Sequence, residues 1–539
     1  MFKLLRTTES DSVENNDRYL TPLEQLPNEI LIEIFKNLPL SDRITVERVC
    51  KNWQIVAKQS WYQLKALCMD PKVLGFKTSI GGARKCFADN YALQQVLNRC
   101  GKYISTIDVS MIHYCALSLI AQLCKSLKIL YCCNVSARGT YDLSNNCENL
   151  EKIVITGTVT DISQISLHQL FSKATKLRDI CLQNYVGSGE CFTKLPLNQM
   201  LSIKIGHIDI DCSIRTINKT KLLKEFACTN VQRGLITSMS NVCVDLTKID
   251  LKADPLINSH DIDSALSCLF NSNKNLRSLT LRSFENMTGH CFFSLNKQVV
   301  DEIVLISSEN VKKNYLKDSF SSFDKLTKLE LRYVNKFKLG RIADCIFECQ
   351  NLKRLSLDYF RQYSTKSLIK SISNTRELEE LELAHFNNSR IEKSFTDYVS
   401  FNLEKLKILT LRRCKGLTEN HLINICKLTN IQVLDVSGNV NLDGFSFRNF
   451  RKLREMYCSY CPCITNDILS KFIQRADNLN VLDIAGCRKI TNSSIVVAIQ
   501  VTTEKRRLLQ SKLEIRVRGT GVMSDQIKNT SAFLYIKDT

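Results

Sequence analysis

The stretch LEELEL at residues 378–383 decides how most of this 539-residue chain folds. Its leucines follow the pattern Leu-x-x-Leu-x-Leu, and Leu381 and Leu383 lie on one apolar side because alternate residues of a strand share a face. The same pattern, with Ile, Val, Met or Cys in place of some leucines, recurs on average about every 25 residues. Its sixteen starts are residues 104, 127, 150, 177, 200, 223, 246, 276, 300, 326, 352, 378, 406, 431, 453 and 479. A period of this length indicates a repeat protein.

Each repeat is expected to contain a short strand, a turn and a helix that pack on one core. In the repeat that begins at Leu453, Leu469 and Phe472 follow the strand at helical spacing, and Thr465 or Asn466 is placed to cap that helix. One such unit cannot bury its apolar face alone, whereas stacked units can. The periodicity therefore predicts a curved α/β solenoid, with a parallel sheet on the inside and helices on the outside.

Four late repeats carry an Asn or a Cys three residues after the last strand position. These residues are Cys414, Asn439, Cys461 and Cys487. The repeats thus resemble the leucine-rich-repeat family, in its cysteine-containing subtype, where this residue bonds the turn. Earlier repeats depart from the pattern and have Tyr185, Val334, Phe360 and Phe386 at this place. The resemblance implies an inner surface that suits a folded protein or a long peptide better than a small metabolite.

The N-terminal stretch LPNEILIEIFKNLP at residues 26–39 has helical periodicity instead. Pro39 is expected to end this helix, and Ser41 or Asp42 to cap a second one that runs toward Trp53. A unit of about 45 residues has little core of its own. Its wide apolar stripe therefore packs either on the adjacent solenoid or, as we favour, on a partner protein.

This N-terminal unit closely resembles an F-box, from Leu26-Pro27 through Val49-Cys50-Lys51-x-Trp53. The resemblance implies binding to the Skp-type adaptor of cullin-based ubiquitin ligases. By position, the adaptor-contacting residues would be Leu26, Pro27, Ile30, Leu31, Ile34, Phe35, Leu38, Val49, Cys50 and Trp53. Arg43 stands where the family usually has Leu, which would weaken adaptor binding unless Ile44 fills the gap.

An F-box followed by leucine-rich repeats is the arrangement of the F-box/leucine-rich-repeat substrate receptors. The expected domains are a disordered tail at 1–19, the F-box at 20–66, a linker and cap at 67–100, about sixteen repeats at 101–520 and a C-terminal tail at 521–539. The cap should contain a helix near Tyr91 to Asn98. The N-terminus lacks the apolar core of a signal peptide, and no apolar run approaches the length of a membrane span. The 24 cysteines should then be mostly free thiols in the cytoplasm or the nucleus.

Catalytic motifs are largely missing from the sequence. The seven histidines have no metal-ligand spacing, and no phosphate-binding loop or nucleophile elbow is present in the sequence. The best metal candidate is the set Cys458, Cys461 and Cys463 with Cys487. These cysteines are better explained as strand and turn residues of the repeats than as metal ligands. We therefore expect a non-catalytic chain without a metal or other cofactor.

The formal net charge of +20 first points to an acidic partner. However, the strand positions expected to face the inside of the solenoid carry nine basic and twelve acidic residues. Basic residues gather only in the middle repeats, and these are the expected substrate-binding residues: Lys248, Lys252, Arg282, Lys328, Arg332 and Arg354. Such a patch would bind an acidic or phosphorylated segment. The alternative is a solvated face on which these charges form salt bridges.

Three functions remain as hypotheses. The first is the substrate-recognition subunit of an SCF-type ubiquitin ligase, which binds a Skp-type adaptor and a cullin scaffold through the F-box and a protein substrate through the repeats. The second is a non-ligase leucine-rich-repeat scaffold or inhibitor. The third, nucleic-acid binding, rests on net charge alone and is disfavoured, and no membrane partner is expected. The sequence names neither the substrate nor the feature by which it would be recognised.

Overall fold

A computed structural model describes residues 26–69, 83–112, 117–159, 164–254, 261–308, 310–320, 323–333, 345–359, 364–386, 391–504, 512–523, 527 and 533–538. The chain divides into two compact units, residues 1–157 and 158–539.

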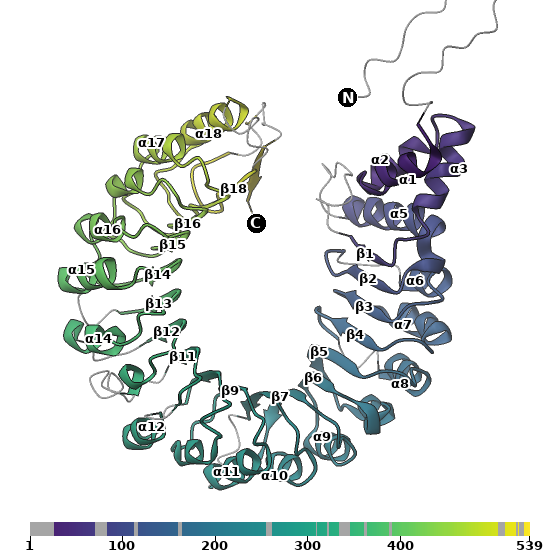
Figure 1. Cartoon of the computed structure of the whole chain (residues 1–539), viewed down its shortest axis with the longest axis horizontal. Coiled ribbons are helices and arrows are strands. Elements are labelled where there is room, and N and C mark those ends of the chain that lie inside the picture. The colour runs from purple at the N-terminus through teal and green to yellow at the C-terminus, as the bar shows by residue number, and fades with distance from the viewer. Residues whose placement is uncertain are drawn as a thin grey trace, which may run out of the picture. The chain divides into compact units, whose positions relative to one another are not determined.

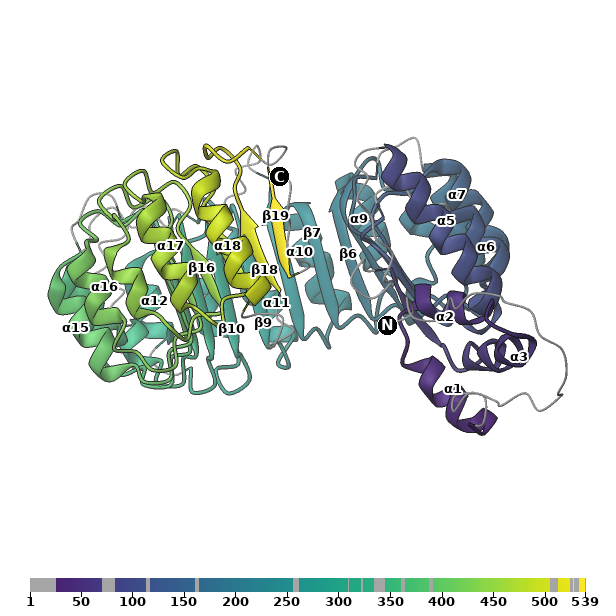
Figure 2. The ribbon, with the colours of Figure 1, turned by 90° about the horizontal axis from the view of Figure 1, so that it is seen from above.

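The first unit begins with three short helices and continues as parallel strands that alternate with helices. The helices are α1 Asn28–Lys36, α2 Leu40–Val46, α3 Lys51–Ser60, α5 Ala83–Cys100, α6 Leu117–Leu123 and α7 Ala137–Leu143. The strands β1 Ala66–Cys68, β2 Thr106–Val109, β3 Ile129–Cys132 and β4 Lys152–Ile155 pair in chain order, all parallel. Helices α5, α6 and α7 lie next to one another on one side of these strands (Figures 1 and 2).

The second unit repeats the strand–helix alternation from β5 to β19, and each strand pairs in parallel with the next. The strands are β5 Asp179–Val186, β6 Ser202–His207, β7 Glu225–Val231, β8 Lys248–Ala253, β9 Ser278–Arg282, β10 Glu302–Ile306, β11 Lys328–Arg332, β12 Arg354–Asp358, β13 Glu380–Ala384, β14 Ile408–Arg412, β15 Val433–Asp435, β16 Glu455–Tyr457, β17 Val481–Asp483, β18 Leu513–Arg516 and β19 Leu534–Lys537. Within this unit the strands line the inner side and the helices the outer side (Figure 1).

The helices of the second unit differ in length from repeat to repeat. They are α8 Gln164–Lys173, α9 Ile210–Ile217, α10 Arg233–Val242, α11 Ile262–Ser272, α12 Lys313–Phe320, α14 Thr365–Ile372, α15 Lys393–Asn402, α16 Glu419–Ile425, α17 Asn466–Arg475 and α18 Asn492–Glu504. Short 3₁₀ helices occur in the connections, at Gly101–Tyr103, Ser144–Asn146, Glu190–Lys194, Leu197–Gln199, His290–Ser294 and Phe445–Asn449.

The repeat pattern places the strands correctly. Each of the sixteen predicted starts comes just before or at one of the strands β2 to β17, and the leucines of the pattern are buried, as Leu381 and Leu383 show. The predicted fold class, a three-helix module followed by an α/β repeat array, is confirmed.

The sheet extends past both predicted ends of the repeats, because β1 pairs with β2 near residue 67 and β19 pairs with β18 beyond residue 520. The remaining domain boundaries stay a prediction.

Two details of the N-terminal module differ from expectation. Helix α2 begins at Leu40, directly after Pro39, and not behind a Ser41 or Asp42 cap. It also ends at Val46, so Trp53 belongs to the separate helix α3. A proline fits a helix start because its missing N–H has no role there. The start of helix α3 is stabilised by the Cys50 sulfur, which accepts a hydrogen bond from the Trp53 N–H at 3.4 Å.

Candidate functional site

The α1–α3 module has a small core made by residues that the sequence places at the adaptor interface. Leu31, Phe35 and Trp53 are buried together with Val56 and Ala57. The rings of Phe35 and Trp53 meet edge to face, with centroids 5.2 Å apart. Leu26 and Leu38 pack against this core and are partly buried. Five of the ten predicted adaptor residues therefore hold the module together from within.

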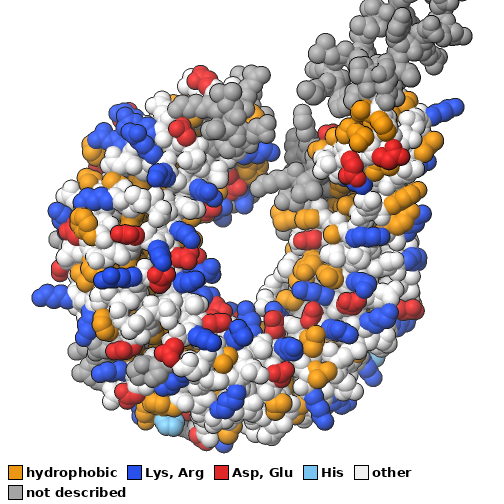
Figure 3. All heavy atoms as spheres, viewed as in Figure 1, with side chains coloured by type: hydrophobic (Ala, Val, Ile, Leu, Met, Phe, Trp, Pro, Cys, Tyr) orange, Lys and Arg blue, Asp and Glu red, His pale blue; other side chains and the backbone are white. Residues whose placement is uncertain are grey.

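The other five predicted residues form what we call the exposed apolar set: Pro27, Ile30, Ile34, Val49 and Cys50. Ile30, Ile34 and Val49 are 48%, 40% and 55% exposed. Ile30 and Ile34 are four residues apart on α1 and share one face of that helix. A hydrogen bond from Asn52 to Asn28, at 3.4 Å, holds the start of α3 beside the start of α1. Hydrophobic side chains are visible on the surface over these helices (Figure 3).

Arg43, the departure from the F-box pattern, is a buried residue with a structural role. It is only 5% exposed, donates a hydrogen bond to the Lys36 carbonyl at the end of α1, and lies over the Trp61 ring at 5.0 Å. Burial lowers the pKa of the Arg43 guanidinium. Arg43 thus packs inside the module beside Trp61 and also satisfies a helix-end carbonyl.

Glu47 ties the N-terminal module to α5, the helix of the predicted cap. One of its carboxylate oxygens accepts a hydrogen bond from the Trp61 indole at 2.8 Å. The other pairs with the Arg99 guanidinium on α5 at 2.7 Å. Since the Glu47 side chain is 9% exposed, this contact is largely shielded from water. The module is therefore anchored to the cap helix through a charged hydrogen bond.

The predicted substrate residues lie on the inner face of the second unit, but four of the six are paired. Arg282 pairs with Asp250 at 2.9 Å and Arg354 with Glu380 at 3.2 Å. The other pairs are Lys328 with Glu302, and Arg332 with Glu330 and Glu382. Figure 3 shows acidic and basic side chains next to one another on this inner side.

The remaining two predicted residues, Lys248 and Lys252, are exposed on β8 and have no ion pair within the described parts of the chain. The sequence left two interpretations of this patch, a binding surface for an acidic segment and a face of salt bridges. The second one fits the paired residues Arg282, Lys328, Arg332 and Arg354. Whether any of the six contacts a substrate stays a prediction.

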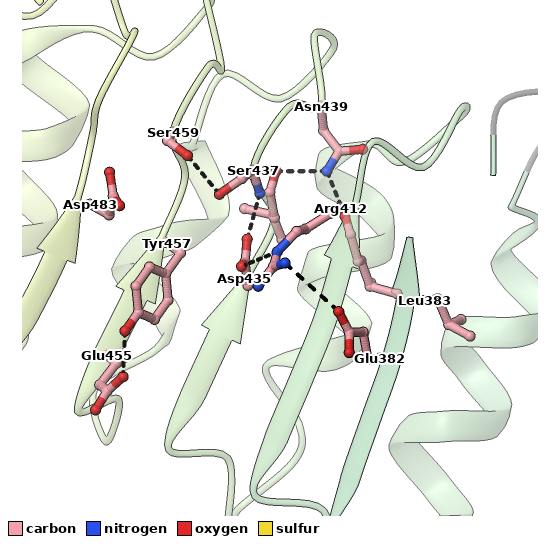
Figure 4. A network of polar contacts seen from close by, with 12 residues as sticks. Glu382, Leu383, Arg412, Asp435, Ser437, Asn439, Glu455, Tyr457, Ser459 and Asp483 are labelled. Atoms are coloured by element: carbon pink, nitrogen blue, oxygen red, sulfur yellow. Dashed lines mark hydrogen bonds and ion pairs between the residues drawn. The ribbon is translucent and has the colours of Figure 1, made fainter. Parts of the chain in front are cut away.

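The turn residues identified from the sequence bond the turns as expected. The Asn439 amide donates to the carbonyls of Leu411 and Val436 (Figure 4). Its oxygen accepts from the Cys414 N–H. The thiols of Cys461 and Cys487 donate to carbonyls at 3.4 and 3.1 Å.

Burial raises the pKa of the Cys461 thiol to about 12, so this sulfur is an inert structural group. Among the described residues, no group of three or more His, Cys, Asp or Glu side chains could hold a metal ion, and each cysteine whose side chain the structure describes is a free thiol. Val334 and Phe360, the predicted equivalents in two earlier repeats, lie outside the described residues.

A site that sequence reasoning missed lies where strands β9 to β18 end. In ten successive repeats the equivalent residue has a positive φ. We call these residues the left-handed column: Ser283, Ser307, Tyr333, Tyr359, His385, Arg413, Gly438, Tyr460, Gly486 and Gly519. From Ser283 to Gly486, the N–H of each column residue donates to a carbonyl of the next repeat and so continues the ladder.

The middle of this column is an aromatic stack. The rings of Tyr333 and Tyr359 are 4.3 Å apart, and those of Tyr359 and His385 are 4.0 Å apart, both pairs nearly parallel. Asp358 is bonded to His385 Nδ1 at 2.8 Å, and Arg413 approaches His385 Nε2 at 3.4 Å. The recurrence of Tyr, Tyr and His at 333, 359 and 385, each 26 residues apart, is the signal in the sequence that could have revealed it.

The stack borders a groove of about 580 Å³ along the carboxyl ends of β11 to β18. Its lining also includes Arg412, Arg413 and Arg516, with Asp435 and Asp483 between them. Arg412 pairs with Asp435 at 2.6 Å and reaches Glu382 at 3.7 Å (Figure 4). We call this site the Tyr–Arg groove.

These features define a class of protein: an F-box-like module followed by a leucine-rich-repeat array. Residues 23–66 match the F-box-like family. Over 59 residues the chain is 37% identical to the human F-box/LRR-repeat protein 12, a match that covers 10% of this chain and 18% of that protein. The chain therefore combines an F-box-like module with the repeated strand–helix array described above.

Longer matches are more distant. The Caenorhabditis elegans "Putative RNA-binding protein EEED8.10" is 22% identical over 460 residues, which cover 83% of this chain and 54% of the relative. The chain thus spans about half the length of this relative. The yeast structure described as a Rad7 and Elc1 complex aligns with 91% of this chain and 94% of its own, at 16% identity and a TM-score of 0.36. Within the described residues, no helix is long and apolar enough to cross a membrane.

Proposed function

We propose that this protein is a substrate-recognition subunit of an SCF-type ubiquitin ligase. The F-box-like module would bind a Skp-type adaptor and, through it, a cullin scaffold, while the repeats would hold a target protein for ubiquitination. The chain itself would catalyse nothing, and would act by raising the local concentration of the target near the ubiquitin-loaded enzyme. Free thiols in the described residues agree with a site of action in the cytoplasm or the nucleus.

The observation that carries this proposal is the exposed apolar set on a module that matches the F-box-like family at residues 23–66. Ile30, Ile34 and Val49 are already about half buried, so burying the rest of each side chain would contribute about 1 kcal/mol before the costs of association are subtracted. These side chains do not belong to the core of the module, which leaves them available to a partner.

The decisive experiment compares matched isoleucine substitutions in the full chain. The double variant Ile30→Asp with Ile34→Asp should lose co-purification with the Skp-type adaptor and the cullin. The control Ile165→Asp changes an isoleucine that is 78% exposed on α8 of the second unit, and it should retain both partners. Unchanged adaptor capture by the double variant, or no capture by the intact chain, would remove the proposal.

The second hypothesis, a scaffold or inhibitor outside a ligase, differs in the fate of the proteins bound to the repeats. In cells that carry a chain with the Ile30→Asp and Ile34→Asp changes, a substrate receptor should cause its bound targets to accumulate. A scaffold would leave their abundance unchanged. Quantitative proteomics of the proteins captured with each version separates the two.

RNA binding is raised by the name of the Caenorhabditis elegans relative and is the weaker candidate. RNA is a polyanion, and a surface that binds it needs a row of basic side chains that are not paired with carboxylates. On the inner face of the second unit, Arg282, Lys328, Arg332 and Arg354 are each paired with a carboxylate.

A further inference from the structure

The Tyr–Arg groove has a donor-rich surface above buried acceptors. Its guanidinium groups face outward, since the side chains of Arg412 and Arg516 are 48% and 35% exposed. Its carboxylates lie underneath, with Asp435 and Asp483 at 6% and 17%. A ligand that enters the groove therefore meets N–H groups before it meets carboxylate oxygens.

The acidic side chains of the groove are already used by the protein. Asp435 accepts from the Ser437 N–H at 2.9 Å and from Arg412, and Asp483 accepts from the Ala485 N–H at 3.0 Å. Arg516 also pairs with Glu514 at 2.8 Å. Further out, Glu455 accepts from the Tyr457 hydroxyl at 2.7 Å. The carboxylates thus hold the turns and orient the arginines.

Arg413 is different from the other two arginines. Among the described residues it has no carboxylate partner, and its side chain contacts the imidazole of His385 instead. Gly438 keeps the space beside it open, because a Cβ there would lie 2.6 Å from Arg413 Cγ. Arg413 is therefore an exposed, oriented cation next to the aromatic stack.

We propose that the Tyr–Arg groove binds an extended acidic peptide segment of the recruited protein, with one Asp or Glu carboxylate on Arg413. The proposal rests on the proposed function and names its substrate-docking site. A guanidinium without a carboxylate partner matches one carboxylate, which it can bind with two hydrogen bonds. The tyrosine edges and hydroxyls of the groove provide contacts for the flanking peptide.

Charge and stacking argue for a peptide over a nucleic acid. Glu382, Glu455 and Glu514 surround the groove and oppose a continuous row of phosphates. The facing sides of Tyr333, Tyr359 and His385 are occupied by one another, so bases cannot stack between them. A single localised anion avoids both problems.

The test begins with a display library of random dodecapeptides selected against the full chain. Selected peptides should be enriched in Asp and Glu. Fluorescence anisotropy of one selected peptide should then show binding that weakens about ten-fold in Arg413→Gln and less in Arg413→Lys. The matched control Arg475→Gln, which removes an exposed arginine on α17, should leave binding unchanged.

Other outcomes would overturn the inference. It fails if the selected peptides are not acidic, or if Arg413→Gln and Arg475→Gln have the same effect. It also fails if only the phosphoserine version of the peptide binds, or if a labelled twelve-residue oligouridine binds more tightly than the peptide and depends on Arg413. The proposed function has a separate readout, because Arg413→Gln should still capture the Skp-type adaptor while the Ile30→Asp, Ile34→Asp variant should still bind the peptide.

Discussion

At the scale of single residues, Gly206 on β6 is a position where only hydrogen fits. A Cβ at this residue would lie 2.2 Å from the Tyr185 carbonyl oxygen and 2.6 Å from the Gln183 carbonyl oxygen. Both atoms belong to the backbone of the neighbouring strand, next to an irregularity in the register of β5 and β6. Backbone atoms cannot swing away as a flexible side chain can, so the two strands would have to separate.

We expect Gly206→Ala to destabilise the second unit by at least about 2 kcal/mol, because it forces the β5–β6 pairing apart. The matched control is Gly234→Ala on α10, where a Cβ meets only the end of Ile214 at 3.6 Å. An alanine in that helix should be neutral or stabilise by up to about 1 kcal/mol. Thermal unfolding followed by circular dichroism measures both, and equal melting temperatures would contradict the argument.

Arg43 gives a second prediction at this scale. Arg43→Ala should lower the stability of the N-terminal module by about 2–3 kcal/mol, since it leaves a cavity beside Trp61 and removes the donor to the Lys36 carbonyl. Arg43→Met should cost less than about 1 kcal/mol, because it keeps the packing and removes a buried charge. The protein has two tryptophans, Trp53 and Trp61, and both are in this module, so tryptophan fluorescence reports on it selectively. A larger loss in the Met variant would show that the charge itself stabilises the module.

At the scale of elements, neighbouring strands of the second unit are linked by carboxylates that bond to the adjacent repeats. Glu302 on β10 is an example, since its carboxylate binds Lys328 on β11 and the Ser278 hydroxyl on β9. Burial alone would raise the pKa of Glu302, but the hydrogen bonds from Lys328 and Ser278 outweigh it and hold the pKa below its ordinary value of 4.5. The folded protein thus favours the ionised form.

This shift predicts a pH-dependent effect of Glu302→Gln. A carboxyl whose pKa is depressed by folding contributes stability above its ordinary pKa, and that contribution is lost as the pH falls through the folded-state value. Glu302→Gln should therefore lower the melting temperature at pH 7, and the gap to the parent chain should close as the pH falls below about 4.5. Because the Glu302 carboxylate is partly exposed, the two chains should differ in their free energy of unfolding at pH 7 by about 0.5–1 kcal/mol. Glu148→Gln, at an exposed carboxylate, controls for the change in net charge, and a gap that persists in acid would be contrary to expectation.

The junction between α2, α3 and α5 depends on the Glu47–Arg99 pair. A double-mutant cycle of Glu47→Gln and Arg99→Gln should give a coupling free energy of about 1–2 kcal/mol, as a largely shielded charged hydrogen bond is broken. Tryptophan fluorescence is the suitable signal because Trp61 donates to the same Glu47 carboxylate. Additive effects of the two substitutions would mean that the pair does not anchor the module.

At the scale of the whole molecule, a small helical core and a long array of repeats are joined in one chain. A repeat array is stabilised by contacts between neighbours, whereas the F-box-like core consists of a few side chains on α1 and α3 with Val46 at the end of α2. The two parts therefore need not unfold together.

We expect urea unfolding followed by tryptophan fluorescence to precede the transition followed by circular dichroism. The fluorescence signal comes from the N-terminal module alone, and the dichroism signal comes mainly from the repeats. The Arg43→Ala variant should move the first transition to lower urea and leave the second in place. Coincident transitions in the parent chain would show that the two parts are one cooperative unit.

The sequence predicts most of the fold because burial of the repeat leucines depends only on their spacing. It predicts less of the site for two physical reasons. A helical stripe such as that of Ile30, Leu31, Ile34 and Phe35 shows which residues are apolar, but not where the module's own core ends and a partner begins. The ion pairs of Arg282 and Arg354 depend on the register between neighbouring strands, β8 with β9 and β12 with β13, and spacing alone does not reveal which charges meet.

The left-handed column has a further consequence for how this protein can change. Gly or Asn would occupy its positions at lower conformational cost than Tyr333, Tyr359, His385, Arg413 or Tyr460. At these positions selection for a more stable chain and selection for a surface that binds a target would act in opposite directions. If the Tyr–Arg groove binds a target as proposed, replacing its aromatic residues one by one with Gly or Asn would give more stable chains that bind the target less tightly. Different side chains at the same backbone positions would then change the choice of target without a new fold.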